Sequence, residues 1–222
     1  MRPLVLPATL LALLAAAPPA APQSRASALS VQVNVATLHA ATLTAARGGD
    51  DRADQPYLLA SILGPGPATS TARVPADGHL TIQLDEAIRA RPLVSLSLAP
   101  GETARVVITA LEGPRVDLVL EGRVATAATA RANESSSALG ARLAEALAPL
   151  AILEDHWLGA ALLEIVNDAG TLRWRTFACL TTCEVLNAPD ATTAPGTPLA
   201  GVLELTGAGG TYHLQLETRT GR

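Results

Sequence analysis

The residues best suited to chemistry are carboxylates in an acidic turn near the start of the chain. Asp50, Asp51 and Asp54 share this short turn with Arg52. Carboxylates this close repel one another unless solvent, an arginine or a cation compensates. Calcium suits such oxygens, whereas Arg52 and water could neutralise the turn without any ion. The turn therefore indicates either a calcium ligand set or a plain solvated loop.

A second acidic turn, Glu154-Asp155-His156, precedes an apolar segment later in the chain. Calcium takes about six to eight oxygen ligands, so the two turns could share an ion only if they lie side by side. A further alternative is a hydrolase in which Asp54 and Asp155 act as paired carboxylates. That reaction would need a cleft, which short loops do not indicate.

Other catalytic patterns are absent from the sequence. It contains no G-x-S-x-G and no H-E-x-x-H, and a phosphate-binding Walker A motif is impossible because there is no lysine. His39, His79, His156 and His213 are dispersed, and we interpret them as structural or exposed residues, with His156 the exception because it lies in the second acidic turn. The sequence therefore favours a non-catalytic module.

The acidic turns lie between short segments in which apolar and polar residues alternate. This period of two places one side of a strand in a core. The segments expected as strands are 30–44, 57–63, 69–74, 79–84, 93–98, 103–112, 158–166, 171–177, 202–205 and 212–216. Gly and Pro turns separate them, and the glycine cluster 207–210 is expected to be a hairpin turn. The pattern predicts an all-β, antiparallel β-sandwich.

One amphipathic helical insertion is expected at about 117–150. Leu139, Leu143, Leu147 and Leu150 fall on one helical face, Asn133 or Ser135 can cap the start, and Pro149 limits the end. The part from 117 to 124 could be a strand or a helix. The helix could lie on a membrane surface, but its polar face carries Arg142 and Glu145 instead of a basic stripe, which favours packing against the sandwich.

The N-terminal residues have the pattern of a secretory signal peptide. Arg2 precedes an apolar run at 4–17, which is shorter than the roughly 20 residues of a membrane span. Ala26-Ser27-Ala28 supplies a cleavage signal, Ala20-Ala21 is an alternative, and an uncleaved anchor is a further one. We expect a signal peptide at 1–28 and one exported domain at 29–222, periplasmic or extracellular, with no membrane span after cleavage.

Composition excludes one class of partner. All 16 basic residues are arginine, the net charge is −4, and only 2% of residues are aromatic. Nucleic-acid binding needs basic surface and stacking platforms, and this chain lacks both. Arginine without lysine indicates a GC-rich bacterial genome. The expected partner is a protein or ligand of the cell envelope.

Cys179 and Cys183 are the two cysteines of the chain. In an oxidising compartment, a pair this close in sequence favours a disulfide across a tight loop. A metal or redox pair is the alternative, although the spacing is not C-x-x-C and no histidine lies near.

Asp54-Gln55-Pro56-Tyr57 and Asp155-His156-Trp157-Leu158-Gly159 resemble the calcium-binding loops of a C2 domain, a β-sandwich. The family's intervening Asp-x-Asp is replaced by Ala110-Leu111-Glu112, and the helical insertion replaces a short loop. The resemblance and the two acidic turns together imply a calcium site formed by Asp50, Asp51, Asp54, Glu112, Glu154 and Asp155. The incomplete motifs predict weak affinity, about 10⁻⁴ to 10⁻³ M.

Overall fold

The computed structural model describes residues 28–44, 53–63, 69–113, 118–129, 134–153, 156–181, 183–186 and 198–221. The strands are β1 (Leu29–Thr42), β2 (Pro56–Leu63), β3 (Thr69–Val74), β4 (Ala87–Leu98), β5 (Thr103–Glu112), β6 (Trp157–Asp168), β7 (Thr171–Thr181), β8 (Cys183–Leu186), β9 (Pro198–Gly207) and β10 (Gly210–Gly221). The helices are α1 (Leu118–Ala127) and α2 (Ser136–Leu153).

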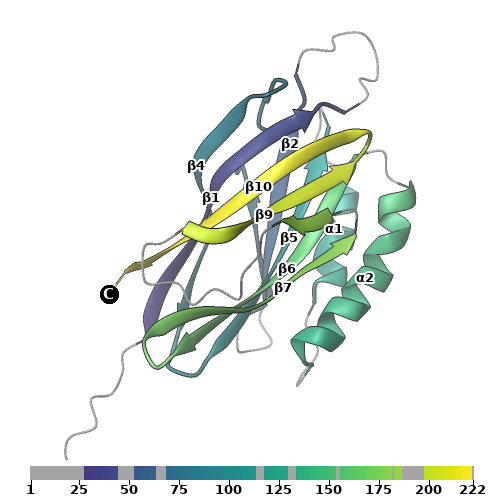
Figure 1. The fold of residues 1–222 in the computed structure, drawn as a ribbon. Coiled ribbons are helices and arrows are strands. Elements are labelled where there is room, and N and C mark those ends of the chain that lie inside the picture. Colours follow the sequence, from purple (N-terminus) through teal and green to yellow (C-terminus); the bar gives the residue numbers. More distant parts are fainter. Residues whose placement is uncertain are drawn as a thin grey trace, which may run out of the picture.

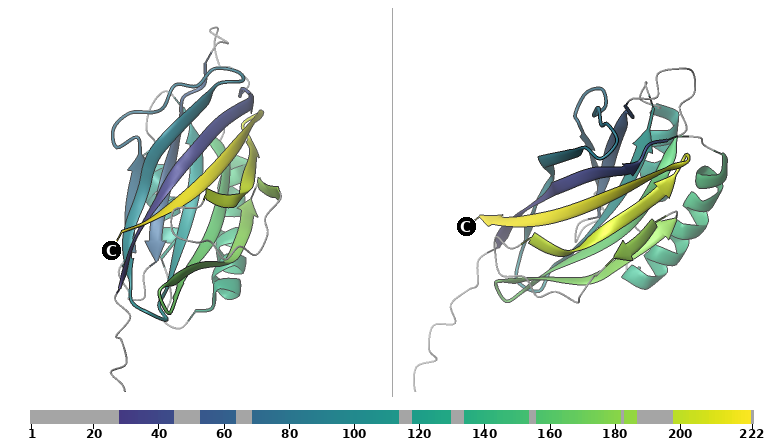
Figure 2. Two further views of the ribbon diagram at one scale, coloured as in Figure 1. Left: turned by 60° about the vertical axis from the view of Figure 1, so that its left-hand side comes forward. Right: turned by 45° about the horizontal axis from the view of Figure 1, so that its top comes forward.

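The strands form two five-stranded antiparallel sheets that face each other (Figures 1 and 2). The strand order is β4-β1-β10-β9-β8 in the first sheet and β3-β2-β5-β6-β7 in the second. Both helices lie against the outer side of the second sheet and form a third layer (Figure 1). The predicted all-β antiparallel sandwich with a helical insertion is confirmed.

The main core lies between the two sheets. Val31, Val33 and Val35 of β1 are buried there, while Gln32 is partly exposed, as a period of two requires. β10 contributes Leu214 from the neighbouring strand. Alternation in the sequence therefore located this core correctly.

A second core lies between the helices and the second sheet. The predicted face of α2, formed by Leu139, Leu143, Leu147 and Leu150, is buried in it together with Trp157 of β6. β6 is thus covered on both sides, which explains its nearly continuous apolar sequence. Packing of α2 against the sandwich is confirmed. Among the described residues, no helix has the length and apolarity needed to cross a membrane.

Polar contacts fix the start of α2. The Ala138 amide donates to the Ser135 hydroxyl, 3.2 Å away, so Ser135 is the expected N-cap. Ser136 donates to the buried carboxylate of Glu164 on β6 and accepts a hydrogen bond from Arg105 Nε at 2.7 Å. The helix is therefore attached to the sheet by hydrogen bonds as well as by its apolar face. Its end is less well predicted, since α2 continues past Pro149 to Leu153.

Segment 79–84 is not the strand that its alternation predicts. Only Ile82 forms a bridge, with Asp54, although Leu80 and Ile82 are both buried. Leu84, predicted to share their face, is 55% exposed. Leu80 also donates its amide to the Pro56 carbonyl at 2.8 Å, so the segment pairs with the start of β2 over too few residues to form a strand. The ambiguous segment 117–124 is resolved from residue 118 onward, where α1 begins.

The two cysteines lie where the chain passes from the second sheet to the first. Cys179 is in β7 and packs against the main core, and Cys183 begins β8. The side chain of Cys183 lies outside the described residues, so the disulfide stays a prediction.

Candidate functional site

The described residues that border the two predicted acidic turns lie at the same end of the sandwich. Glu112 is the register partner of Pro56. The Gly113 amide donates to the Gln55 carbonyl at 3.2 Å, and the Glu112 amide donates to the His156 carbonyl at 2.8 Å. The described residues next to the two turns are thus held together by main-chain hydrogen bonds. We call this region the Asp54 end.

Only part of the predicted calcium set can be placed. Asp54 and Glu112 are described, whereas Asp50, Asp51, Glu154 and Asp155 lie outside the described residues. Within the described part of the chain, no group of three His, Cys, Asp or Glu side chains could hold a metal ion. The calcium ligand set therefore stays a prediction.

Asp54 is the centre of a buried hydrogen-bond network. Its side chain accepts from the Thr44 amide at 2.7 Å, from the Thr44 hydroxyl at 2.8 Å and from the Tyr212 hydroxyl. Asp54 is only 5% exposed, and Tyr212 is fully buried. This carboxylate joins the end of β1 to β10 and the start of β2, so its first role is structural.

The Tyr212 hydroxyl is held in its protonated form. Burial is the largest cause that raises the pKa of Tyr212, followed by its hydrogen bond to Asp54 and by the charges of Asp54 and Glu112. A phenol in this state donates a hydrogen bond and cannot serve as an anionic nucleophile near neutral pH. Sequence reasoning missed Tyr212, because only its alternation within a strand was visible.

The glycine turn between β9 and β10 closes over the Asp54 end. A methyl group on Gly210 would lie 2.9 Å from the Thr44 amide nitrogen, and one on Gly207 would collide with the Trp157 carbonyl oxygen. This cluster is the hairpin turn that was predicted. Its glycines are required because the main chains of β1 and β6 approach it closely.

Two buried polar atoms at this end have no hydrogen-bond partner among the described residues. They are Gln55 Oε1 and His156 Nδ1. His156 directly follows the segment 154–155, which lies outside the described part, and Gln55 is three residues after the segment 45–52, which also lies outside it. Unpaired buried polar atoms are costly, so they mark this end as a place where a further donor or acceptor belongs.

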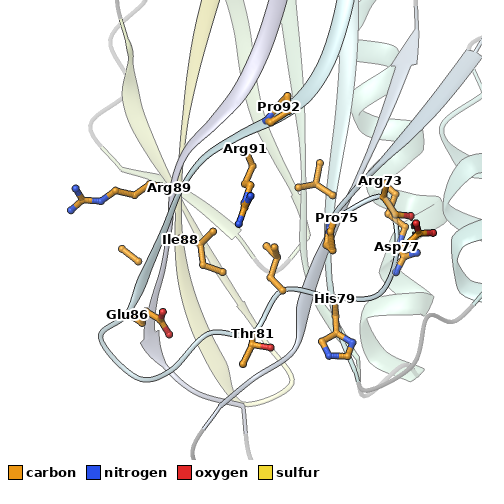
Figure 3. A pocket seen from close by; sticks show the side chains of 14 residues that line it. Arg73, Pro75, Asp77, His79, Thr81, Glu86, Ile88, Arg89, Arg91 and Pro92 are labelled. Atoms are coloured by element: carbon orange, nitrogen blue, oxygen red, sulfur yellow. Dashed lines mark hydrogen bonds between the residues drawn. The ribbon is translucent and has the colours of Figure 1, made fainter.

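A groove of about 740 Å³ lies on another side of the sandwich. It opens between the edge strands β3 and β4 and is bordered by the segment that joins them (Figure 3). Charged side chains line it, namely Arg73, Asp77, His79, Glu86, Arg89 and Arg91. Sequence reasoning missed the groove because it began the β4 strand at Leu93 instead of Ala87.

Arg91 occupies an unusual position in this groove. Its register partner in β1 is Val35, which is buried and faces the core. Figure 3 shows Arg91 projecting from β4 into the space between the edge strands, whereas Arg89 points away from it. Pro92 follows, where the pairing of β4 with β1 shifts register. An arginine thus stands where the strand pattern calls for an apolar residue.

Of the other two groove arginines, Arg89 points away from the space and Arg73 already has partners. Arg73 donates to the carbonyl oxygens of Ala76 and Gly78, lies over the Tyr57 ring at 4.9 Å, and is 3.4 Å from Glu121. No comparable partner exists for Arg91 in the ranges that the structure describes. Arg91 is therefore the positively charged side chain in the groove that is available to bind a ligand.

No protein-family model and no curated protein sequence matches the chain.

Proposed function

We propose that the mature chain is an exported, non-catalytic β-sandwich module of the bacterial cell envelope that binds an anionic ligand in the groove between β3 and β4. The observation that carries this proposal is the unpaired Arg91 at an inward register position of an open cavity. Edge strands often carry inward charges simply to prevent pairing with other chains, and an experiment must separate these two roles.

The chemistry of the groove supports a small anion. A guanidinium presents planar N–H donors that match a carboxylate or phosphate in a bidentate pair. The cavity volume of about 740 Å³ is in the usual range for small-molecule sites. Asp77 and Glu86 also line the groove, so a ligand with neutral donor groups beside its anionic group fits best.

The start of the fold supports export. β1 begins at Leu29, directly after the predicted cleavage signal Ala26-Ser27-Ala28. Removal of residues 1–28 would therefore leave every described strand intact.

We expect Arg91→Gln to weaken binding of a carboxylate probe. A charge-assisted hydrogen bond contributes about 1.5–3 kcal/mol, which corresponds to roughly 10- to 100-fold in affinity. Isothermal titration calorimetry with citrate measures the change, and rising salt should weaken wild-type binding because the groove is open to solvent.

Arg219→Gln is the matched control. Arg219 is exposed on β10, outside the groove, and lies 2.9 Å from Glu217. Equal citrate binding by wild type and Arg91→Gln would contradict the proposal. If Arg91→Gln instead forms oligomers while citrate binding is unchanged, Arg91 protects the edge strand and is not a ligand contact.

Weak calcium binding is a second candidate function. The contacts of Gly113 with Gln55 and of Glu112 with His156 favour it, because they join described residues that border the two acidic turns. Gathered carboxylates repel one another, and a divalent ion would offset that repulsion. The resemblance to a C2 domain points to the same end.

We expect the melting temperature to rise with millimolar calcium. At ten times the dissociation constant, binding to the folded state alone adds about 1.4 kcal/mol. The double variant Glu112→Gln/Asp155→Asn should lose this response, measured by differential scanning calorimetry. These positions are preferable to Asp54, whose carboxylate holds the fold.

Asp168→Asn is the control for calcium. Asp168 ends β6 at the opposite end of the strand from Trp157 and is half exposed. A melting temperature that does not move at tens of millimolar calcium would refute this second candidate and leave the anion-binding proposal untouched.

A further inference from the structure

Two histidines face each other on the solvent side of the first sheet. His39 of β1 and His213 of β10 are register partners, and their ring centroids are 5.7 Å apart. His213 points outward because its neighbours Tyr212 and Leu214 are buried in the core. Both imidazoles are about one-third exposed, at 34%. An incoming ion can therefore reach both rings.

A carboxylate lies near the Nε2 atom of each ring, but only the one beside His213 is within hydrogen-bond distance. Glu204 Oε2 lies 3.2 Å from His213 Nε2, and Asp85 Oδ1 lies 3.9 Å from His39 Nε2. A carboxylate at one ring nitrogen favours the proton on that nitrogen and leaves the lone pair on the other. The Nδ1 of His213 is then available as a ligand, and His39 can offer either ring nitrogen. This is the support that metal-binding histidines use in proteins.

The spacing of the rings fits one shared ion. Metal–nitrogen bonds of about 2.0–2.1 Å at a roughly tetrahedral ion place two imidazole centroids about 5–6 Å apart. The observed separation is 5.7 Å. No third ligand is already close enough, since the described residues contain no metal-holding group of three. Water must complete the coordination.

We propose that His39 and His213 form a two-histidine chelate for a divalent transition-metal ion such as Zn²⁺, with Glu204 orienting the His213 ring. Imidazole nitrogen suits Zn²⁺, Cu²⁺ and Ni²⁺, whereas Ca²⁺ requires oxygen. The site is thus distinct in place and in chemistry from the Asp54 end and from the Arg91 groove.

Zinc titration of tag-free, chelator-treated protein by isothermal calorimetry tests the proposal. We expect one saturable site per chain. His39→Ala and His213→Ala should each weaken zinc binding by about 10²- to 10⁴-fold. Once one histidine holds the ion, the other is present at a high effective concentration, and each variant loses that advantage. The double variant should show no saturable zinc binding, because both ligands are then gone. His79→Ala, a histidine of the groove, is the control and should bind zinc like wild type.

Glu204→Gln tests the orienting role separately. Loss of the carboxylate should weaken zinc binding by about 10- to 100-fold while both ligands remain. Melting temperatures measured with chelator show whether each variant is folded. Absence of saturable binding by folded wild type would overturn the proposal. So would binding that survives in the double variant, because the ion would then lie elsewhere.

Discussion

Asp54→Ala is expected to lower the free energy of unfolding by about 3–5 kcal/mol. The variant removes the acceptor of three donors: the Thr44 amide, the Thr44 hydroxyl and the Tyr212 hydroxyl. A buried donor left without an acceptor costs about 1–3 kcal/mol, and the cavity admits little water because Asp54 is 5% exposed. Urea denaturation followed by circular dichroism measures the loss.

Two conservative variants separate the contacts of Asp54. Tyr212→Phe removes one donor and should cost about 1.5–3 kcal/mol, since the acceptor is a carboxylate. Asp54→Asn keeps one carbonyl oxygen for Thr44 and offers an amide donor to the Tyr212 oxygen, so it should cost less than Asp54→Ala. A loss below about 1 kcal/mol in Asp54→Ala would show that this network does not hold the end of the sandwich.

The dependence of stability on alkaline pH provides a second measurement of the same hydrogen-bond network. The pKa of Tyr212 is raised in the folded protein, mainly by burial. Above the ordinary tyrosine pKa of about 10, the unfolded chain loses this proton while the folded chain keeps it. Stability contributed by the protonated phenol is therefore complete below about pH 10 and is lost as the pH rises further. Tyr212→Phe should reduce this alkaline loss.

The local sequence pattern predicts those strands and helices that pack along their whole length against a regular neighbouring element. Alternating valines placed β1 in the main core, and the leucine spacing of α2 placed its buried face. The pattern failed at 79–84, where Leu80 and Ile82 are buried but the main-chain pairing with 54–56 is limited to a single bridge and one further hydrogen bond. Periodicity reports burial, and burial alone does not require a ladder.

The candidate sites depended on contacts that no local pattern contains. The sequence shows that Asp54 belongs to an acidic turn. It does not show that Tyr212, which is 158 positions away in sequence, is its hydrogen-bond partner. Arg91 was overlooked because the expected strand began at Leu93, whereas β4 begins at Ala87. The strand pairing was needed to recognise both residues. Arg91 pairs with the buried Val35, so it lies on the inward side of β4, and Tyr212 lies on the inward side of β10. Such exceptions to pattern are expected at functional or strained positions.

Gly207→Ala is expected to destabilise the protein by at least about 3 kcal/mol. The added methyl group would collide with the Trp157 carbonyl oxygen and would lie 2.9 Å from Leu158 Cα. These are main-chain atoms of β6, which is covered on both sides and cannot shift without moving a core. Overpacking against a fixed backbone costs about 1–3 kcal/mol or more, and this contact is severe.

Gly122→Ala is the matched control because it makes the same chemical change in open space. A methyl group on Gly122 of α1 would meet no atom within 4 Å, and alanine favours the helix by about 0.5–1 kcal/mol. Opposite shifts in the urea midpoint are therefore expected from the two variants. Because β9 belongs to the first sheet and β6 to the second, Gly207→Ala should also separate the sheets at the Asp54 end. Faster hydrogen exchange at the Thr44 amide would report that separation. An unchanged midpoint in Gly207→Ala would mean that β9 does not approach β6 this closely, and the close contact between the two sheets at this end would have to be abandoned.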